Sequence, residues 1–486
     1  MIRVNQKVNR TPYFEILSED QVYAIHSASL EILEGTGMNI HNEEALKIFG
    51  EGGANIEGNR VRIPPIMVEQ ALKSAPSRIL VTGRYGKGKV LLERNMVNYG
   101  LGTDVPNHID PYTHRIRPTV LKDIENTGKV VQKCDNIDFT SNSGLASDIP
   151  PQMQDLYHYR AGSVYCDKPF FTTAANGKNM KALIDMAAVF AGSYEKLRKS
   201  PSLIVYGEPM SPLGLIREAA EVLLVCAEYG IPIVFPPMVQ AGATGPMTLA
   251  GSIAQGNAET LASLVLHQLR SPGAPFIWGP FASQMDMKTT ICTYGGPVFI
   301  KAQAALGPIS RFYKIPTFGF ACCTDAIAVD VQCGIEMLWS ILINAMAGLN
   351  LCHDVGYLNS GLLFSLESLL LADELISAVN HFMGGIEVNE ETLATDLINK
   401  VGPEGNFLME EHTMKFLKSE GWYPQFLNRK NYEAWKAAGS KTVNQRLEDK
   451  VHQIIETELP ARVSEDEMKE LDKIIAGREK ELGLKT

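Results

Sequence analysis

His353 and Asp354 are adjacent residues with side chains suited to catalysis or ligand binding, in the stretch LNLCHDVGYLNSG (349–361). The stretch begins like a buried strand and carries both side chains to its end. Three interpretations are open: an acid/base couple, part of a metal site, or a histidine that satisfies its own hydrogen bonds in the core. Adjacent residues on a strand point to opposite faces, so the choice depends on where this strand ends.

Acidic and aromatic side chains follow the ends of the other strand-like runs, and lysine and arginine are almost absent there. The acids are Asp104, Glu208, Asp286 and Asp325. The aromatic residues are Tyr99, Tyr206, Trp278, Phe281, Tyr294, Phe320 and Tyr357. Ring faces attract quaternary ammonium groups within about 6 Å of the centroid. A phosphate ester would instead call for basic groups or a glycine-rich helix N-terminus. The set favours a small cationic substrate, although single rings could equally fill the core.

Metal and nucleophilic chemistry find little support in the motifs. The sequence has no HxH, HExxH or Cys/His cluster at a strand end, and a catalytic metal usually needs three protein ligands. Cys322 and Cys323 have apolar neighbours and no local base, and no GxSxG elbow is present. We expect no metal site. An acid/base enzyme that uses His353 with Asp104 or Glu208 stays open.

Composition excludes several classes of protein. The 486 residues carry a formal net charge of −10, whereas nucleic-acid binding needs a basic face. No apolar run is long enough to span a membrane, and the N-terminus lacks a signal-peptide pattern. The eight cysteines are scattered and form no CxxC pair, which is typical of reduced thiols in a cytoplasmic protein.

Eight strand-like runs alternate with helical stretches and predict an α/β fold, a (β/α)8 TIM barrel over residues 96–385. The runs are 97–104, 136–144, 169–175, 202–209, 232–238, 275–281, 316–325 and 349–356. A doubly wound open sheet also alternates, but no GxGxxG follows an early strand. Residues 1–95 are expected to form a cap of helices and small strands, with a Ser18-capped helix that stops at Gly35 or Gly37. Residues 386–486 are expected to form a charged helical extension packed on the barrel. In this fold the active site lies at the C-terminal ends of the strands.

Four long stretches resemble a known family across essentially the full chain. They are AGATGPMTLAGSIAQGNAETLA (241–262), DMKTTICTYGGPVFIKAQAALGPISRFYKIP (286–316), HDVGYLNSGLLFSLESLLLADE (353–374) and GPEGNFLMEEHTMKFL (402–417). The chain resembles the trimethylamine methyltransferase superfamily, whose founding members carry pyrrolysine in the barrel mouth. The corresponding region, around 321–330, holds no such residue. The chain therefore looks like the non-pyrrolysine branch, which demethylates quaternary amines and passes the methyl group to Co(I) of a separate corrinoid protein.

The resemblance implies a substrate, a partner and residue roles. Glycine betaine is the expected substrate, with proline betaine and carnitine as alternatives. No cofactor is expected to be tightly bound, because the cognate corrinoid protein presents the corrinoid. The residues expected to bind substrate are Tyr99, Asp104, Glu208, Phe281, Tyr294, Phe320, His353 and Tyr357. The residues expected where the corrinoid approaches are Gly242, Thr244, Gly245 and Asp325.

Within this interpretation no residue needs to act as an acid, base or nucleophile. Tyr99, Tyr294 and Phe320 are the first candidates to cage the ammonium group. His353 would hydrogen-bond a substrate carboxylate, and Asp354 would anchor its loop. Two other classes of function stay open, a metal-free barrel lyase or hydrolase and a non-catalytic binder of cationic osmolytes. Barrels of this size often pair, so a homo-oligomer stays open too.

Overall fold

The computed structural model describes residues 14–86 and 88–484, and the chain begins with the expected capped helix. Helix α1 (Glu19–Glu31) starts at Ser18, whose hydroxyl accepts the Gln21 N–H while the Gln21 side chain accepts the Ser18 N–H. The helical turns end at Gly37, which has a φ of +73°. A Cβ there would lie 2.3 Å from the Val61 carbonyl oxygen, so this turn requires glycine. The cap continues through β1 (Met38–Ile40), α2 (Glu43–Glu51), β2 (Asn55–Glu57), β3 (Arg60–Arg62) and α3 (Pro65–Ser74).

Eight short parallel strands form a closed barrel, and each lies within one of the eight predicted runs. They are β6 (Asn98–Tyr99), β9 (Thr140–Ser141), β10 (Phe170–Thr172), β11 (Leu203–Tyr206), β13 (Ile233–Val234), β15 (Phe276–Ile277), β17 (Phe318–Phe320) and β18 (Leu351–His353). They pair in chain order, and β18 returns to β6. Bridges from Gly100 to Phe139 and from Trp278 to Thr317 join the remaining neighbours. The predicted (β/α)8 barrel is confirmed.

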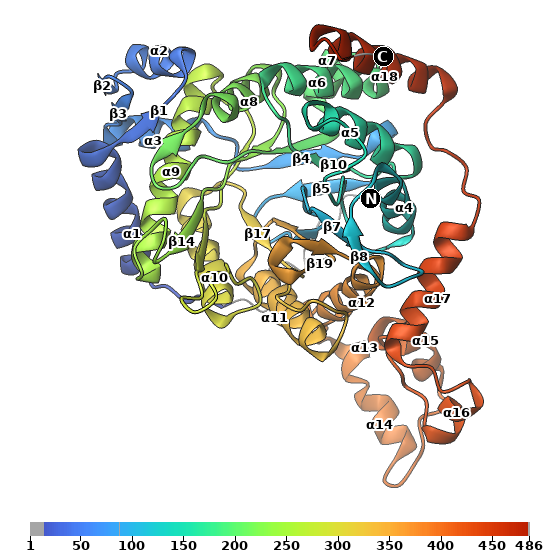
Figure 1. The fold of residues 1–486 in the computed structure, drawn as a ribbon. Coiled ribbons are helices and arrows are strands. Elements are labelled where there is room, and N and C mark those ends of the chain that lie inside the picture. The colour runs from blue at the N-terminus through green and yellow to red at the C-terminus, as the bar shows by residue number, and fades with distance from the viewer. Residues whose placement is uncertain (1–13, 87, 485–486) are drawn as a thin grey trace.

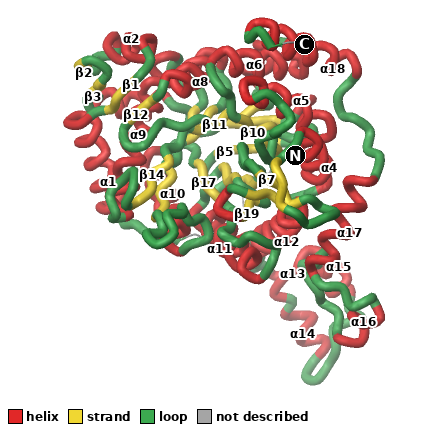
Figure 2. The backbone as a smooth tube through the Cα atoms, in the orientation of Figure 1, coloured by secondary structure: helices red, strands yellow, loops and turns green. Residues whose placement is uncertain are grey.

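Helices surround the barrel, one after each strand (Figures 1 and 2). They are α4 (Leu121–Lys133), α5 (Gln154–Tyr165), α6 (Gly177–Ala191), α8 (Arg217–Tyr229), α9 (Leu249–Arg270), α10 (Pro297–Tyr313), α11 (Val331–Ala347) and α12 (Leu366–Met383), with short α7 (Tyr194–Lys199) following α6. Further strands lie in the loops that follow the barrel strands. They are β7 (Asn107–Ile109), β8 (Ile116–Pro118), β12 (Gly214–Leu215), β14 (Met238–Ala241), β16 (Phe281–Gln284), β19 (Tyr357–Leu358) and β20 (Leu363–Phe364).

A hairpin closes the N-terminal end of the barrel. It consists of β4 (Ile79–Thr82) and β5 (Lys89–Leu92), and the Thr82 N–H donates to the carbonyl of Pro201, just before β11. Four of its apolar side chains join the barrel interior, and they are Ile79, Val81, Val90 and Leu92. Because this end is filled, a ligand can enter the barrel only from the C-terminal ends of the strands.

The C-terminal region divides into a projecting part and a packed part. Figure 1 shows α13 (Glu390–Leu393), α14 (Thr395–Val401), α15 (Glu411–Glu420) and α16 (Tyr432–Ala437) standing away from the barrel. Helix α17 (Val443–Glu456) packs on α12 and α4, and α18 (Glu465–Glu481) packs on α6 and α5. The buried Arg478 of α18 donates from Nε to Asn179 of α6 at 2.7 Å. None of the described helices is long and apolar enough to cross a membrane.

Candidate active site

Strand alternation and one left-handed residue place His353 and Asp354 together. Leu351 and His353 share the inward face of β18, whereas Cys352 points outward, with its sulfur 3.7 Å from the side-chain oxygen of Asn344 on α11. Asp354 has a φ of +74°, so the extended backbone ends there. Its Oδ1 lies 3.4 Å from His353 Nε2. The two adjacent side chains therefore meet at the mouth of the barrel.

Aromatic rings surround His353. Its ring centroid lies 4.3 Å from those of Phe318 and Phe320, 5.5 Å from that of Phe171 and 5.7 Å from that of Tyr206. The side chain is almost fully buried, and burial holds the pKa of His353 well below its ordinary value. Within the described part of the chain its Nδ1 has no hydrogen-bond partner. His353 is thus an uncharged ring with one polar atom left over for a ligand.

Phe320 links this group to a second set of rings. Its centroid lies 4.8 Å from that of Phe281 and 6.2 Å from that of Tyr294, and the Phe281 and Tyr294 rings are 5.4 Å apart. Phe299 of α10 packs behind them, 5.1 Å from Phe281. Tyr294 and Tyr206 keep partial exposure, while Phe281, Phe299 and Phe320 are buried. The rings together form a continuous aromatic wall.

Three carboxyl groups lie at the same end of the barrel, on loops after different strands. Asp104 follows β6, Glu208 follows β11 and Asp354 follows β18. Burial raises the pKa of all three, and for Asp354 the shift is large. The charge of Asp104 further raises the pKa of Glu208, and that of Glu208 further raises the pKa of Asp354. The three groups are therefore close enough to resist one another's ionisation.

Tyr357 and Asp354 meet across Gly102. A Cβ built on Gly102 would lie 2.0 Å from Asp354 Oδ1 and 2.8 Å from Tyr357 Cε2, so both groups pack directly against this glycine and a side chain there would displace them. The Tyr357 ring is buried, and its hydroxyl has no hydrogen-bond partner among the described residues. An unpaired buried hydroxyl is costly to leave without a ligand or water.

The structure does not bring Tyr99 to this group. Its side chain points away from the interior, into the layer between strands and helices, where its hydroxyl donates to the Ile341 carbonyl of α11 at 3.3 Å. Trp278 also points outward, and its Nε1 donates to Asn257 of α9 at 3.0 Å. Both sequence assignments placed the residue at the right strand but on the wrong face, because a period of two fixes the face only when the register is known.

The other expected substrate residues do converge at the mouth. They are Asp104, Glu208, Phe281, Tyr294, Phe320, His353 and Tyr357. The sequence reasoning missed Phe171, Phe318 and Phe299. Phe318 could have been found, because it lies two residues before Phe320 and so shares its face.

The loop expected to face the corrinoid is exposed and tightly turned. Gly242 has a φ of +91°, and its N–H donates to the Gly245 carbonyl at 3.0 Å. The N–H of Thr244 donates to the Gln240 carbonyl, and the Thr244 hydroxyl accepts the Gln240 N–H at 2.9 Å. This geometry is that of a tight turn after β14, and it leaves the backbone of Gly242 at the surface.

Asp325 connects loops at the mouth. Its carboxylate accepts the backbone N–H groups of Tyr294 at 2.7 Å and Gly295 at 3.0 Å, and the Ser360 hydroxyl at 2.8 Å. These residues belong to the loops that follow β16 and β18. The contacts give Asp325 a bracing role that holds Tyr294 in the aromatic wall.

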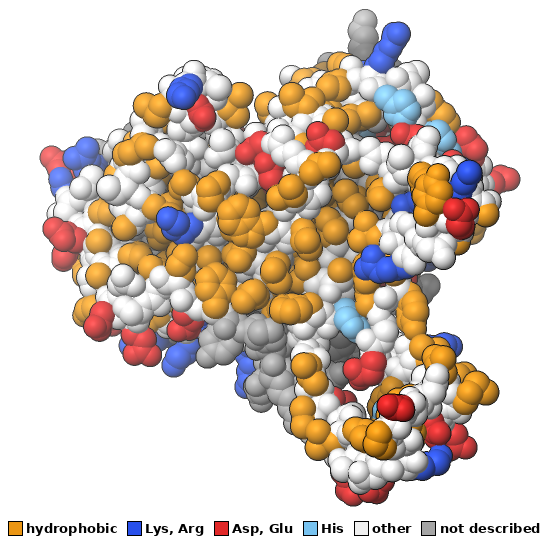
Figure 3. All heavy atoms as spheres, turned by 90° about the horizontal axis from the view of Figure 1, so that it is seen from below, with side chains coloured by type: hydrophobic (Ala, Val, Ile, Leu, Met, Phe, Trp, Pro, Cys, Tyr) orange, Lys and Arg blue, Asp and Glu red, His pale blue; other side chains and the backbone are white. Residues whose placement is uncertain are grey.

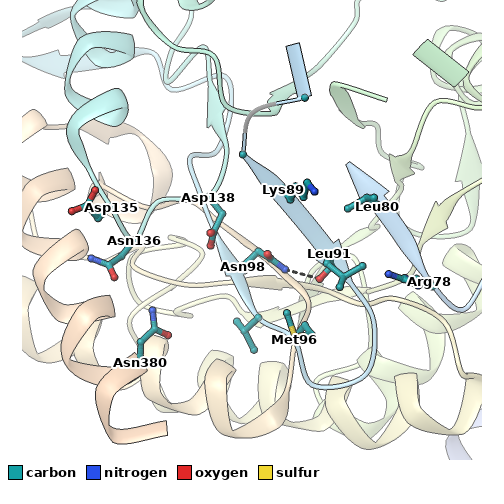
Figure 4. Close-up of a pocket in the computed structure, with 13 residues that line it drawn as sticks. Arg78, Leu80, Lys89, Leu91, Met96, Asn98, Asp135, Asn136, Asp138 and Asn380 are labelled. Atoms are coloured by element: carbon teal, nitrogen blue, oxygen red, sulfur yellow. Dashed lines mark hydrogen bonds between the residues drawn. The ribbon is translucent and has the colours of Figure 1, made fainter. Parts of the chain in front are cut away.

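A separate cavity of about 490 Å³ lies at the opposite end of the barrel (Figure 4). Its walls include Leu80 and Leu91 of the closing hairpin and Asn98 at the start of β6, whose Nδ2 donates to the Leu91 carbonyl at 3.1 Å. Conserved architecture in barrel enzymes places catalysis at the other end of the strands. We therefore assign the site to the mouth around His353. In residues 14–86 and 88–484 no group of three or more His, Cys, Asp or Glu side chains is placed to hold a metal ion.

A solved structure resembles this fold. The monomethylamine methyltransferase of Methanosarcina barkeri aligns with a TM-score of 0.50 and 11% identity, over 91% of this chain and 88% of that one. At this identity the likeness supports the fold alone.

Known sequences are similar over nearly the whole chain. A trimethylamine methyltransferase of Desulfitobacterium hafniense is 33% identical over 472 residues, covering 96% of this chain and 94% of the relative. A glycine betaine methyltransferase from another strain of that species is 30% identical over 481 residues, covering 97% and 98%. Residues 2–483 match the family described as trimethylamine methyltransferase (MTTB). The chain is a methyltransferase and belongs to the trimethylamine methyltransferase family.

Proposed function

We propose that this enzyme removes a methyl group from a small quaternary ammonium compound and transfers it to Co(I) of a corrinoid carried by a separate protein. The observation that carries the proposal is the barrel mouth, where a wall of aromatic rings faces three carboxyl groups. Ring faces and carboxylates both stabilise an ammonium cation. The family membership supplies the reaction class.

The chemistry asks little of the protein beyond positioning. The N–CH3 bond breaks, its electron pair stays on nitrogen, and the methyl group goes to the corrinoid, which supplies the nucleophile. The leaving tertiary amine is neutral and needs no proton. The rings of Phe320 and Tyr294 would hold the ammonium group and exclude water, so that one methyl group points out of the mouth. The uncharged His353 ring fits a role in positioning the substrate better than the role of an acid, because burial opposes its protonation.

The rim of the mouth supports an approach by a partner protein. Gly242 and Thr244 lie in the turn after β14, beside the exposed side chains of Met247 and Met287. Exposed methionines suit an adaptable protein contact, and a glycine turn permits close approach. We propose that this rim is where the corrinoid protein docks.

Glycine betaine is the substrate expected from the sequence, and proline betaine and carnitine are the alternatives. The glycine betaine methyltransferase relative supports this choice. Among the described residues, His353 Nδ1 and the Tyr357 hydroxyl are two buried polar atoms at the mouth that have no hydrogen-bond partner, so they would bond the polar end of such a substrate.

We propose a cytoplasmic location, supported by eight free cysteines.

We propose that copies of the chain pair through α11, whose outer side chains Val331, Ile335 and Trp339 are exposed. Figure 3 shows hydrophobic side chains gathered on the underside of the molecule, where α10 and α11 lie in Figure 1. Light scattering of the purified protein tests the pairing.

The reaction is tested with purified protein, reduced cobalamin and one quaternary amine at a time under anaerobic conditions. Methylcobalamin and the demethylated amine should form in equal amounts, and only when protein is present. No methyl transfer to free cobalamin or to the cognate corrinoid protein would contradict the proposal. Cleavage without cobalamin would favour a lyase or hydrolase, and binding without turnover would favour an osmolyte binder.

A further inference from the structure

No lysine or arginine pairs with the carboxyl groups at the mouth in the described part of the chain. Asp104, Glu208 and Asp354 lie on three separate loops, and no lysine or arginine of the described chain forms an ion pair with any of them. Buried carboxylates are normally paired or protonated, because an isolated buried charge is very unfavourable. This arrangement therefore requires either bound protons or a cation from outside the chain.

Hydrogen bonds satisfy the three groups unequally. Asp104 accepts from Asn142 Nδ2 at 3.2 Å and from the Thr173 hydroxyl at 3.3 Å. Glu208 accepts the hydroxyl of Tyr206. Among the described residues, the Asp354 side chain has only the contact at 3.4 Å with His353 Nε2. Asp354 is thus the least satisfied of the three acids.

A second observation points to a ligand beside Asp354. The buried Tyr357 hydroxyl has no partner among the described residues, and the Tyr357 ring and Asp354 Oδ1 both pack directly against Gly102. The unpaired Nδ1 of His353 is a third polar atom in this region. Buried polar atoms without a partner, next to an acid that has a single long contact, indicate a place that a bound molecule completes.

The groups that face the acids do not themselves titrate near neutrality. Burial raises the pKa of the hydroxyls of Tyr206, Tyr294 and Tyr357 well above the ordinary value, and burial does the same for the thiols of Cys322 and Cys323. Burial lowers the pKa of His353. Asp155 of α5 accepts the N–H of Ala175 and the side chain of Asn179, and burial, with a smaller contribution from the charge of Asp104, raises its pKa. Proton binding at the mouth is therefore carried by the carboxyl groups.

The charge of the ligand decides how well it fits such a cluster. A cation favours an ionised neighbour, so its entry drives a proton off one carboxyl group. A zwitterion brings a carboxylate of its own into a region where the three acids have no lysine or arginine partner among the described residues. Its positive and negative ends nearly cancel, and its carboxylate would repel any acid that ionised.

We propose that the site selects methylated ammonium compounds that carry a net positive charge and no carboxylate, and that each molecule bound displaces one proton from the carboxyl cluster. The inference rests on the proposed function, because the selected cation is the methyl donor. It departs from the expectation of glycine betaine. It also narrows the proposed substrate from quaternary amines in general to those that carry a net positive charge.

Choline and glycine betaine form a matched pair of probes, because they share the trimethylammonium head and differ in a hydroxymethyl or carboxylate end. Calorimetric titration of the full-length protein at pH 7 should show choline binding at least about tenfold more tightly than glycine betaine. Titration in two buffers of different ionisation enthalpy should show close to one proton released per choline. Tetramethylammonium should behave like choline, because it lacks the variable end altogether.

Variants distinguish the effect of the carboxyl cluster on choline binding from the effect of negative charge elsewhere at the mouth. Asp354→Asn should reduce proton release and weaken choline binding about tenfold or more, and Glu208→Gln should act in the same direction if the first variant folds poorly. Asp286→Asn is the matched control, because Asp286 lies half-buried on a loop at the mouth, where its carboxylate accepts the backbone N–H groups of Lys288 and Thr289 in its own turn. Choline affinity in that variant should stay within about twofold of the parent.

The outcomes distinguish the two proposals. Equal or tighter binding of glycine betaine, or choline binding without proton release, overturns the charge rule. If glycine betaine is then also demethylated in the cobalamin assay, the proposed function stands and only the charge rule fails. If choline binds with proton release but no amine yields methylcobalamin with free cobalamin or the corrinoid protein, the charge rule holds for binding and the proposed function fails.

Discussion

Phe320 lies at the junction of the two ring groups, so its replacement should reveal whether the aromatic wall holds the ammonium. Its centroid is 4.3 Å from that of His353 and 4.8 Å from that of Phe281, and the side chain is buried. Phe320→Leu keeps an apolar side chain and should cost less stability than the about 3–5 kcal/mol of a Phe-to-Ala change, because it removes less buried volume. It also removes a desolvated ring face, which contributes about 1–2 kcal/mol to cation binding. Since about 1.4 kcal/mol is tenfold, the dissociation constant should rise about 5- to 30-fold.

The matched control for Phe320→Leu is the same substitution in an outward-facing ring. Phe276 of β15 is fully buried on the outer face of its strand, where it packs on His267 at a centroid distance of 5.4 Å. Phe276→Leu should lower the unfolding temperature comparably and leave ammonium affinity unchanged. Calorimetric titration with tetramethylammonium and thermal unfolding by circular dichroism measure both quantities. Unchanged affinity in Phe320→Leu would refute the assignment of this ring to the binding wall.

Three further predictions test other parts of the site. His353→Gln should raise KM with little change in kcat, and steady-state kinetics that instead show lost turnover at unchanged KM would restore an acid/base role for His353. Met287→Glu should raise KM for the corrinoid protein about tenfold while turnover with free cobalamin stays the same, and an equal loss with both acceptors would contradict docking at this rim. Asp354→Asn should stabilise the ligand-free protein at pH 8 and much less at pH 4. The native pKa of Asp354 is raised by burial and by Glu208, so the folded protein holds a proton that the unfolded chain releases above its ordinary pKa. Parent stability therefore falls as pH rises toward the native pKa, and melting curves that are parallel for the two proteins across this range would contradict the raised pKa.

The barrel could be predicted from the sequence because its signals are local. Each strand-like run stands between a glycine- or proline-rich turn and a helical stretch, and this rhythm identified all eight strands. The N-terminal helix was equally predictable, because the Ser18 cap and Gly37 mark its ends by short-range chemistry. The hairpin that closes the barrel was not predicted as such. Its role depends on contacts with strands more than a hundred residues away, such as that of Thr82 with Pro201.

The site was predictable by position along the chain but less so by face. His353 and Phe320 were placed correctly because they end strands whose inward neighbours are apolar. Tyr99 ends its strand too, yet it points into the helix layer and bonds Ile341. A two-residue strand offers too little alternation to fix its register, so its face is set by the neighbours on either side.

The meeting of Asp354 with Tyr357 depends on two backbone features that the sequence does not reveal. A left-handed φ at Asp354 returns its carboxylate to the mouth, and the missing side chain of Gly102, on a different loop, leaves room for it. The ionised form of Asp354 is unfavourable in the ligand-free protein, because burial and the nearby Glu208 both oppose its ionisation. A folded protein keeps such a feature where a ligand relieves it. A cation is the ligand that relieves it most directly, since it removes the repulsion and lets the acid ionise in one step. Asp354→Asn removes the buried acid whose ionisation is unfavourable at high pH, so the variant should be more stable there. It also removes the negative charge that a bound cation would pair with, so the variant should bind the cation more weakly. Gain of stability together with gain of affinity in that variant would show that Asp354 serves the fold and not the substrate.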